Sequence, residues 1–123
     1  SIIQQDINIL VKLISSGYLV QLDAGSLLGH FGPICQKVAE LLLKRNMVHF
    51  IGSDAHNDKK RNFCLLPAVN IARSIMGDNV DALVNDNPRR LISGENIITF
   101  AVTESHVSSN FITRLFNKIK KPQ

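Results

Sequence analysis

The sequence predicts an α/β fold in which parallel strands alternate with helices. Short apolar segments alternate with segments whose apolar residues recur every three or four positions, and polar, turn-forming residues follow each short apolar segment. Strands that are joined through helices run parallel, because each helix returns the chain to the end of the sheet where the previous strand began. At 123 residues, of which 45% are hydrophobic, the chain can bury one core, so one domain or part of one is expected.

Apolar residues at helical spacing predict four helices and one shorter helical segment. They are expected at residues 6–14, 33–45, 65–76, 78–84 and 87–94. Asp6 is the expected N-cap of the first helix, and Asn87, followed by Pro88, is the expected N-cap of the last. Gly17 and Gly77 are expected to end the first and third helices.

Two strands are predicted at residues 18–22 and 47–52, with loops at 23–26 and 58–62. A parallel pair of strands leaves both sheet edges open and cannot surround a core alone. The chain also begins at Ser1, without an initiating Met or a signal-peptide pattern. Both observations lead us to expect a piece of a longer chain, in which the earlier strands of a sheet or barrel precede Ser1.

Composition and charge exclude several function classes. No apolar run reaches the roughly 20 residues of a membrane-spanning helix. Cys35 and Cys64 form no C-x-x-C pair, which argues against a zinc ribbon or a thioredoxin-like motif and favours reduced thiols in a cytoplasmic protein. The net charge of +4 is carried largely by short basic runs, which fit a phosphate-sized target or a solvated tail as well as they fit DNA. No nucleic-acid partner is expected.

Asp54 and His56 are the residues best suited to chemistry. In an extended chain, residues two positions apart project to the same side, so a carboxylate and an imidazole could converge on one metal ion. The D-x-H pattern is common by chance, and a structural role is the alternative interpretation. Its position just after a predicted buried strand favours the metal site, because α/β proteins gather catalytic groups at the carboxyl ends of their strands.

Arg61 is a candidate phosphate-binding residue. It follows Lys59 and Lys60 close to the Asp54–His56 pair, and a guanidinium binds phosphate oxygens in a bidentate manner. Three solvated loop cations are the alternative. The glycine-rich segment at 25–32 lacks the spacing of a P-loop or a dinucleotide site, so it predicts only tight backbone turns. His49 lies within a predicted strand and is expected to be buried and hydrogen-bonded rather than a ligand.

The C-terminal segment has a different pattern. Residues 103–110 are polar and without a period, which indicates a linker. An apolar stripe at helical spacing follows, with basic residues opposite it, and it consists of Phe111, Ile112, Leu115, Phe116 and Ile119. A basic amphipathic helix of this kind can dock on its own protein or contact a membrane surface.

Three blocks of the sequence resemble one enzyme family. They are residues 21–29 (QLDAGSLLG), 48–57 (VHFIGSDAHN) and 87–91 (NPRRL). Together they resemble the bacterial protein-tyrosine phosphatases of the polymerase-and-histidinol-phosphatase (PHP) type, which belong to capsule and exopolysaccharide operons. The resemblance covers residues 5–96, so residues 1–100 are interpreted as the C-terminal portion of the phosphatase domain and 101–123 as a linker and basic amphipathic helix.

The resemblance implies a fold, a reaction and roles for three residues. The fold would be the C-terminal part of a distorted (β/α)7 barrel that holds manganese or other divalent ions at the carboxyl ends of its strands. The reaction would be hydrolysis of phosphotyrosine, usually on the tyrosine kinase that regulates polysaccharide synthesis. Asp54 and His56 match metal ligands of the family, and Arg61 matches a residue that contacts phosphate.

The remaining ligands of the family belong to sequence that would precede Ser1, namely a His-x-His pair, glutamates and the histidine of a His-Pro-Glu-Arg block. Two protein ligands hold a divalent ion weakly, so the chain alone is expected to be inactive. Two other functions remain open. One is a PHP-type phosphoesterase that acts on a small molecule, as in histidinol phosphate hydrolysis. The other is a non-catalytic remnant or interaction module whose basic tail binds a partner or an anionic surface.

Overall fold

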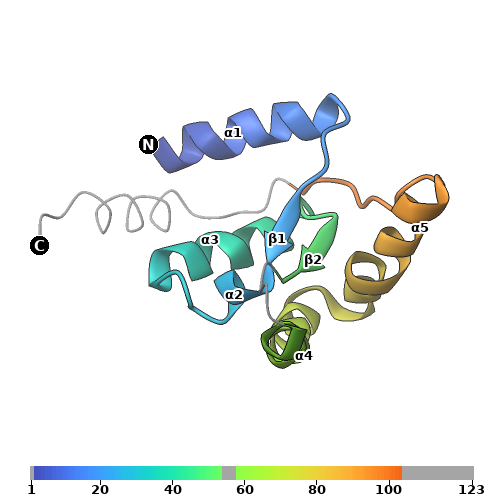
Figure 1. Ribbon diagram of the computed structural model, residues 1–123. Helices are drawn as coiled ribbons and strands as arrows, with labels where there is room; N and C mark the ends of the chain where they lie inside the picture. The colour runs from blue at the N-terminus through green and yellow to red at the C-terminus, as the bar shows by residue number, and fades with distance from the viewer. Residues whose placement is uncertain (1, 54–57, 104–123) are drawn as a thin grey trace, which may run out of the picture.

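The structure, a computed structural model, describes residues 2–53 and 58–103 of the chain. Nine elements follow one another in this part of the chain (Figure 1). They are α1 (Ile2–Ser15), β1 (Gln21–Asp23), α2 (Ala24–Leu27), α3 (Pro33–Lys44), β2 (Phe50–Gly52), α4 (Asp58–Met76), the 3₁₀ turn η1 (Gly77–Asn79), the π-helical turn η2 (Ala82–Asp86) and α5 (Asn87–Ser93).

The strands β1 and β2 pair in parallel, which confirms the predicted α/β class with a small parallel sheet. Leu22 lies opposite Ile51, and Asp23 lies opposite Gly52 at the carboxyl end of the pair. Both strands begin later than predicted, at Gln21 and Phe50, although the backbone oxygen of Val20 already accepts from the N–H groups of His49 and Phe50. The two strands therefore end side by side, and the segments that follow them leave the sheet at the same edge.

Helices cover the sheet on both sides. Figure 1 shows α2 and α3 on one side of the strands, and α5 with the turn before it on the other. The long helix α4 packs against α2 and α3, and η2 packs against β2 and α5. The first helix, α1, lies across the end of the sheet where β1 begins (Figure 1).

The main core lies between the sheet and α2, α3 and α4. Its largest fully buried side chains include Leu27, Leu43 and Leu83, and small residues such as Ala68 and Ala72 let the helices approach closely. The complete set of buried residues is Leu22, Ala24, Leu27, Ala39, Leu43, Val48, Ile51, Ala68, Ala72, Val80, Ala82 and Leu83. This core fixes the strands and hence the edge at which they end.

A smaller apolar cluster joins α1 to the rest of the protein. Its buried members are Ile7, Leu41 and Met47. The side chains packed around them come mainly from α1 and α3, and they are Leu10, Val11, Ile14, Val38, Leu42 and Val102. The predicted amphipathic pattern of residues 6–14 is therefore confirmed as the face that α1 presents to α3.

Two predictions near the first strand are wrong. The helix α1 already begins at Ile2, so Asp6 lies within it and is not its N-cap. Residues 23–26 were expected to form a loop, but Asp23 caps the short helix α2, and its Oδ1 accepts a hydrogen bond of 2.8 Å from the Gly25 N–H. Asp, Gly and Ser favour turns and helix N-termini alike, so their composition did not distinguish the two.

The loop predicted at residues 58–62 is also wrong, because α4 begins at Asp58 and continues to Met76. Lys and Arg are good helix formers, and their polarity was mistaken for a loop signal. The predicted helical segment at 78–84 is irregular: it consists of η1 and η2, between which the hydrogen-bond pattern changes. Gly77 and Gly94 have positive φ angles of 67° and 74°, as expected of residues that end helices.

Asn87 is a further correction. It was expected to be an N-cap, but the N-cap position of α5 is occupied by Asp86, and the Asn87 side chain is completely buried. Its Nδ2 donates to the backbone oxygens of His49 and Ile98, both at 2.9 Å, and its Oδ1 accepts from the Ile98 N–H at 2.8 Å. The side chain thus links the residue before β2 to the segment that follows α5.

We expect Asn87→Ala to lower the free energy of unfolding by about 2–4 kcal/mol, because it leaves three backbone groups without their partner. Asn85→Ala is the matched control: Asn85 is exposed two positions earlier, and its removal should cost less than about 0.5 kcal/mol. Urea unfolding of both variants measures the difference. Equal losses would show that the buried amide has no special role.

Candidate functional site

The candidate site is the edge of the sheet where both strands end. Asp23 and Gly52 are paired there, and the next residues leave the sheet toward α2 and toward Ser53. A Cβ on Gly52 would lie 3.1 Å from Nε2 of Gln21, so the absence of a side chain leaves room for this glutamine across the strand pair. Gly52 therefore ends β2 at this edge without a side chain of its own, and Ser53 follows it directly.

The loop after β1 is folded tightly against this edge. A Cβ on Gly25 would lie 3.1 Å from Nδ1 of His30 and 3.3 Å from Cε2 of Phe31, so the glycine lets both rings lie close to the backbone of α2. Gly29 and Gly32 have φ angles of 81° and 96°, in the region that favours glycine. The tight turns predicted in this glycine-rich segment are present at residues 28–32, after the helix α2.

This loop is also anchored from α3. Nε2 of Gln36 donates a hydrogen bond of 2.9 Å to the backbone oxygen of Leu27, which is fully buried at the end of α2. Pro33 occupies the first turn of α3, as predicted. The segment that follows β1 is therefore held to α3, and a binding site needs such support from its scaffold.

Asp54 and His56, the predicted metal ligands, lie outside the described residues. Among the residues that the structure describes, no group of three His, Cys, Asp or Glu side chains could hold a metal ion. Asp23 is a described carboxylate at the same edge, but one of its oxygens already caps α2. The donor chemistry of Asp54 and His56, a carboxylate and an imidazole, fits a divalent ion, and in the sequence they directly follow the described end of β2.

Arg61 lies in the first turns of α4, and its side chain is outside the described set. The predicted loop of three cations is therefore helical. The backbone N–H groups of a first helical turn have no partners within the helix and, with the helix dipole, favour an anion. The residues that the sequence singled out thus precede or begin the helix that follows β2.

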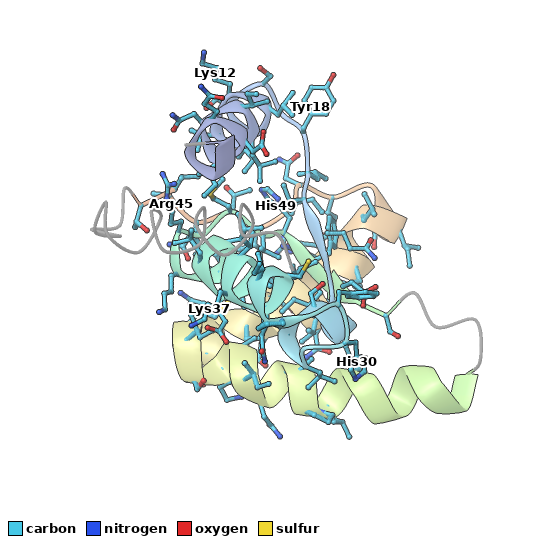
Figure 2. All side chains as sticks on the ribbon, turned by 90° about the vertical axis from the view of Figure 1, so that its left-hand side faces the viewer. Lys12, Tyr18, His30, Lys37, Arg45 and His49 are labelled. Atoms are coloured by element: carbon cyan, nitrogen blue, oxygen red, sulfur yellow. The ribbon has the colours of Figure 1, made fainter. Side chains whose placement is uncertain are left out.

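His49 is buried and hydrogen-bonded, as predicted, and only 5% of its surface is exposed. Its Nδ1 accepts a hydrogen bond of 2.9 Å from the Val20 N–H, so the imidazole is neutral with its proton on Nε2. Burial lowers the pKa of His49 from its ordinary value of 6.5. Figure 2 shows His49 in the interior near the start of β1, whereas His30 lies toward α4 at the other end. His49 is therefore a structural residue at the end of the sheet away from the candidate site.

Two features of this region were missed by sequence reasoning. One is the role of Asp23 as a helix cap, which could have been found from its position before Ala24, Gly25 and Ser26. The other is the buried amide of Asn87, which no local pattern distinguishes from an ordinary N-cap followed by proline. Cys35 is exposed as a free thiol in the first turn of α3, and it has no disulfide partner among the described residues.

A family model described as "Capsular polysaccharide synthesis, CpsB/CapC" matches residues 1–93. The chain belongs to this family. Residues 1–93 include both strands, the candidate edge and α5. The match therefore includes Asp54 and His56 together with the elements that precede and follow them.

Two curated proteins and a solved structure are similar to this CpsB/CapC family member. The tyrosine-protein phosphatase YwqE of Bacillus subtilis is 30% identical over 95 residues, which cover 77% of this chain and 37% of YwqE. CapC of Staphylococcus aureus is 43% identical over 63 residues, or 51% of this chain and 25% of CapC. The matched part of the chain therefore spans only 25% to 37% of the length of these relatives.

The solved structure comes from work on YwqE of Bacillus subtilis and CpsB of Streptococcus pneumoniae, described as metal-dependent tyrosine phosphatases. It matches with a TM-score of 0.70 and 28% sequence identity, over 84% of this chain and 42% of that one. The mixed α/β architecture with a small parallel sheet is thus shared with this structure. Within the described residues, no helix is both long enough and apolar enough to cross a membrane.

We expect the stability of the family member to fall as the pH drops below about 6.5, partly because of His49. Below pH 6.5 the imidazole of the unfolded chain binds a proton, whereas the buried imidazole of the folded chain does not. The contribution of His49 to stability is therefore complete above the pKa of the unfolded state and is lost as the pH falls toward the lower pKa of the folded state. Urea midpoints at about pH 7.5 and 5.5 measure the effect.

His49→Asn should flatten this dependence, since the Asn oxygen can replace Nδ1 as acceptor for Val20 but does not titrate. His30→Asn, the same substitution at an exposed histidine, is the matched control. An unchanged pH dependence in His49→Asn would contradict the assignment.

Proposed function

We propose that this chain forms the C-terminal part of a metal-dependent protein-tyrosine phosphatase of capsule or exopolysaccharide synthesis. The observation that carries the proposal is the position of Asp54 and His56 in the sequence: they come directly after Ser53, which follows β2 where the two parallel strands end. The family match, the similarity to YwqE and the description of the solved relatives as metal-dependent tyrosine phosphatases support it.

The complete domain would be a distorted (β/α)7 barrel of the PHP type, to which β1 and β2 contribute two neighbouring strands. Alternation of helix and strand along the chain and the open edges of a two-stranded sheet support this arrangement. The remaining strands and ligands would come from sequence outside this chain, which spans 37% of YwqE.

Asp54 and His56 would hold a divalent ion, manganese or a similar metal, through carboxylate oxygen and imidazole nitrogen. When bound, such an ion supplies charge stabilisation at the phosphoryl group and a nucleophile at neutral pH. Arg61 would bind the phosphate oxygens of the substrate and orient the phosphorus atom, and the first turn of α4 would favour the same anion. The rigid loop after β1 would exclude water from one side of the site.

The substrate would be a phosphotyrosine protein. The proposed partner is a tyrosine kinase that regulates polysaccharide synthesis, and the family's description by capsular polysaccharide synthesis supports it. A cytoplasmic location accords with such a substrate. Nothing in the described edge favours a small substrate such as histidinol phosphate over a phosphotyrosine side chain.

A chimera tests the metal ligands: the part of YwqE that precedes its match to this chain is joined to residues 1–123. We expect phosphatase activity on a phosphotyrosine peptide with manganese, and none from residues 1–123 alone. Asp54→Asn should lower kcat by about a hundredfold or more, because a metal ligand is lost. Asp78→Asn, at an exposed carboxylate in η1, is the control and should retain full activity. Full activity in Asp54→Asn would remove this residue from the mechanism.

The same chimera tests Arg61. We expect Arg61→Ala to lower kcat/KM on the phosphotyrosine peptide by roughly tenfold to a hundredfold, with partial recovery in Arg61→Lys, since an ammonium keeps the charge but not the bidentate geometry. Lys60→Ala removes one positive charge at the neighbouring position and should change kcat/KM less than about threefold. Equal losses in both alanine variants would indicate a general charge effect and not a phosphate clamp.

A further inference from the structure

An apolar groove lies between α1 and α3. The helix α1 lies at the end of the sheet where β1 begins, whereas the candidate site lies where the strands end (Figure 1). It is lined by Asp6, Ile7, Leu10, Val38 and Leu42, and its volume is about 190 Å³. We call it the α1–α3 groove. An apolar cavity of about 150 Å³ is enough to accept a benzene ring, so the groove is large enough for the ring of a phenylalanine. Among the described residues that line it, Asp6 alone is charged; it is exposed and forms no ion pair with another described residue.

The described chain ends beside this groove. Val102 packs into the same apolar cluster as Ile7, Leu10 and Leu42. The backbone of Thr103 is fixed to the end of α3 in both directions: its N–H donates to the Arg45 oxygen, and its oxygen accepts from Arg45 Nε, each at 3.1 Å. Thr103 Oγ1 also donates to the Lys44 oxygen at 3.1 Å. The C-terminal segment therefore starts from a fixed point at one end of the groove.

The sequence of the following segment complements the groove. At helical spacing, Phe111, Ile112, Leu115, Phe116 and Ile119 share one face. Arg114, Lys118 and Lys121 lie on the other side, where one of them can reach an acidic residue at the rim of a groove. Seven residues separate Thr103 from Phe111, and an extended chain of seven residues spans roughly 23–25 Å, which is ample for a groove that begins next to Val102.

We propose that residues 111–119 bind in cis in the α1–α3 groove, with an aromatic ring between Leu10 and Val38 and a basic side chain near Asp6. This segment lies beyond residues 1–93, which the family model matches, and the contact involves neither the predicted metal ligands nor Arg61, so it is independent of the proposed phosphatase activity. It attaches the C-terminal segment to α1 and covers apolar surface that α1 and α3 leave open.

A pair of double variants of the 123-residue chain tests the proposal without any change in charge. Leu115→Gln with Phe116→Gln alters the apolar face, and Thr113→Gln with Asn117→Gln alters the opposite face. We expect amide exchange in α1 to become about tenfold faster in the first variant, since burial of two apolar side chains is lost, and to stay within about twofold of the parent in the second. Hydrogen exchange followed by mass spectrometry measures both.

A second pair of variants tests the contact by substitution of residues in α1. Leu10 lines the groove, whereas Ile9 points away from it and is 55% exposed. Leu10→Gln should make trypsin cleave after Arg114 about tenfold faster, and Ile9→Gln should leave the rate unchanged. Thermal unfolding of each variant verifies that α1 remains folded. Equal cleavage rates in the two variants, or equal exchange in the two double variants, would overturn the proposal.

Two other occupants give different results. If the segment binds a second copy of the chain, protection of α1 falls on dilution and the mass in solution doubles at high concentration, which overturns binding in cis. If the segment binds a membrane surface, the 123-residue chain binds vesicles that contain phosphatidylserine. The Leu115→Gln, Phe116→Gln variant then loses that binding, while amide exchange in its α1 matches that of the parent, and this result also overturns binding in cis. Protection that is independent of concentration and sensitive only to the apolar face supports the proposal.

Discussion

The structure depends on one buried side-chain amide that forms hydrogen bonds with backbone groups next to β2. Asn87 is completely buried and makes three hydrogen bonds to backbone groups of His49 and Ile98. His49 in turn accepts from Val20 just before β1. A sheet of two short strands has few ladder hydrogen bonds of its own, and buried backbone groups without partners are costly. These two side chains supply partners that further strands would otherwise provide, and so they hold the start of both strands in register.

The residues that stabilise the strand pair and those of the candidate site therefore lie at opposite ends of the strands. His49 and Asn87 act where the strands begin, and the candidate site lies where they end. The same separation is a general property of parallel α/β proteins, in which loops at the carboxyl ends vary while the opposite end maintains the fold. Substitutions at the two ends are therefore expected to have different effects, on unfolding at one end and on metal or phosphate binding at the other.

Much of the fold could be predicted from the sequence because its signals are local. The periods of α1 and α3, Pro33 at a helix start and Gly94 at a helix end each follow from spacing or backbone preference. The errors arose where one composition serves two structures: residues 23–26 form a capped helix, and residues 58–62 form the start of α4. The buried state of Asn87 could not be predicted, because it depends on Ile98 and His49, which are distant in the sequence. The positions of the Asp54 and His56 side chains stay predictions.

The correction at residues 58–62 changes the expected chemistry of the site. A loop of three cations would attract phosphate through charge alone, and salt would screen that attraction over about 10 Å. A helix that starts at Asp58 adds backbone N–H groups that have a common direction and no partners within the helix, and such groups favour an anion at one place. In the proposed site Arg61 would contribute from the first turn of α4, a helix whose later part packs into the core through Ala68 and Ala72. On the proposed function, orientation of the phosphate would therefore depend on the packing of α4 against α2 and α3 as well as on the charge of Arg61.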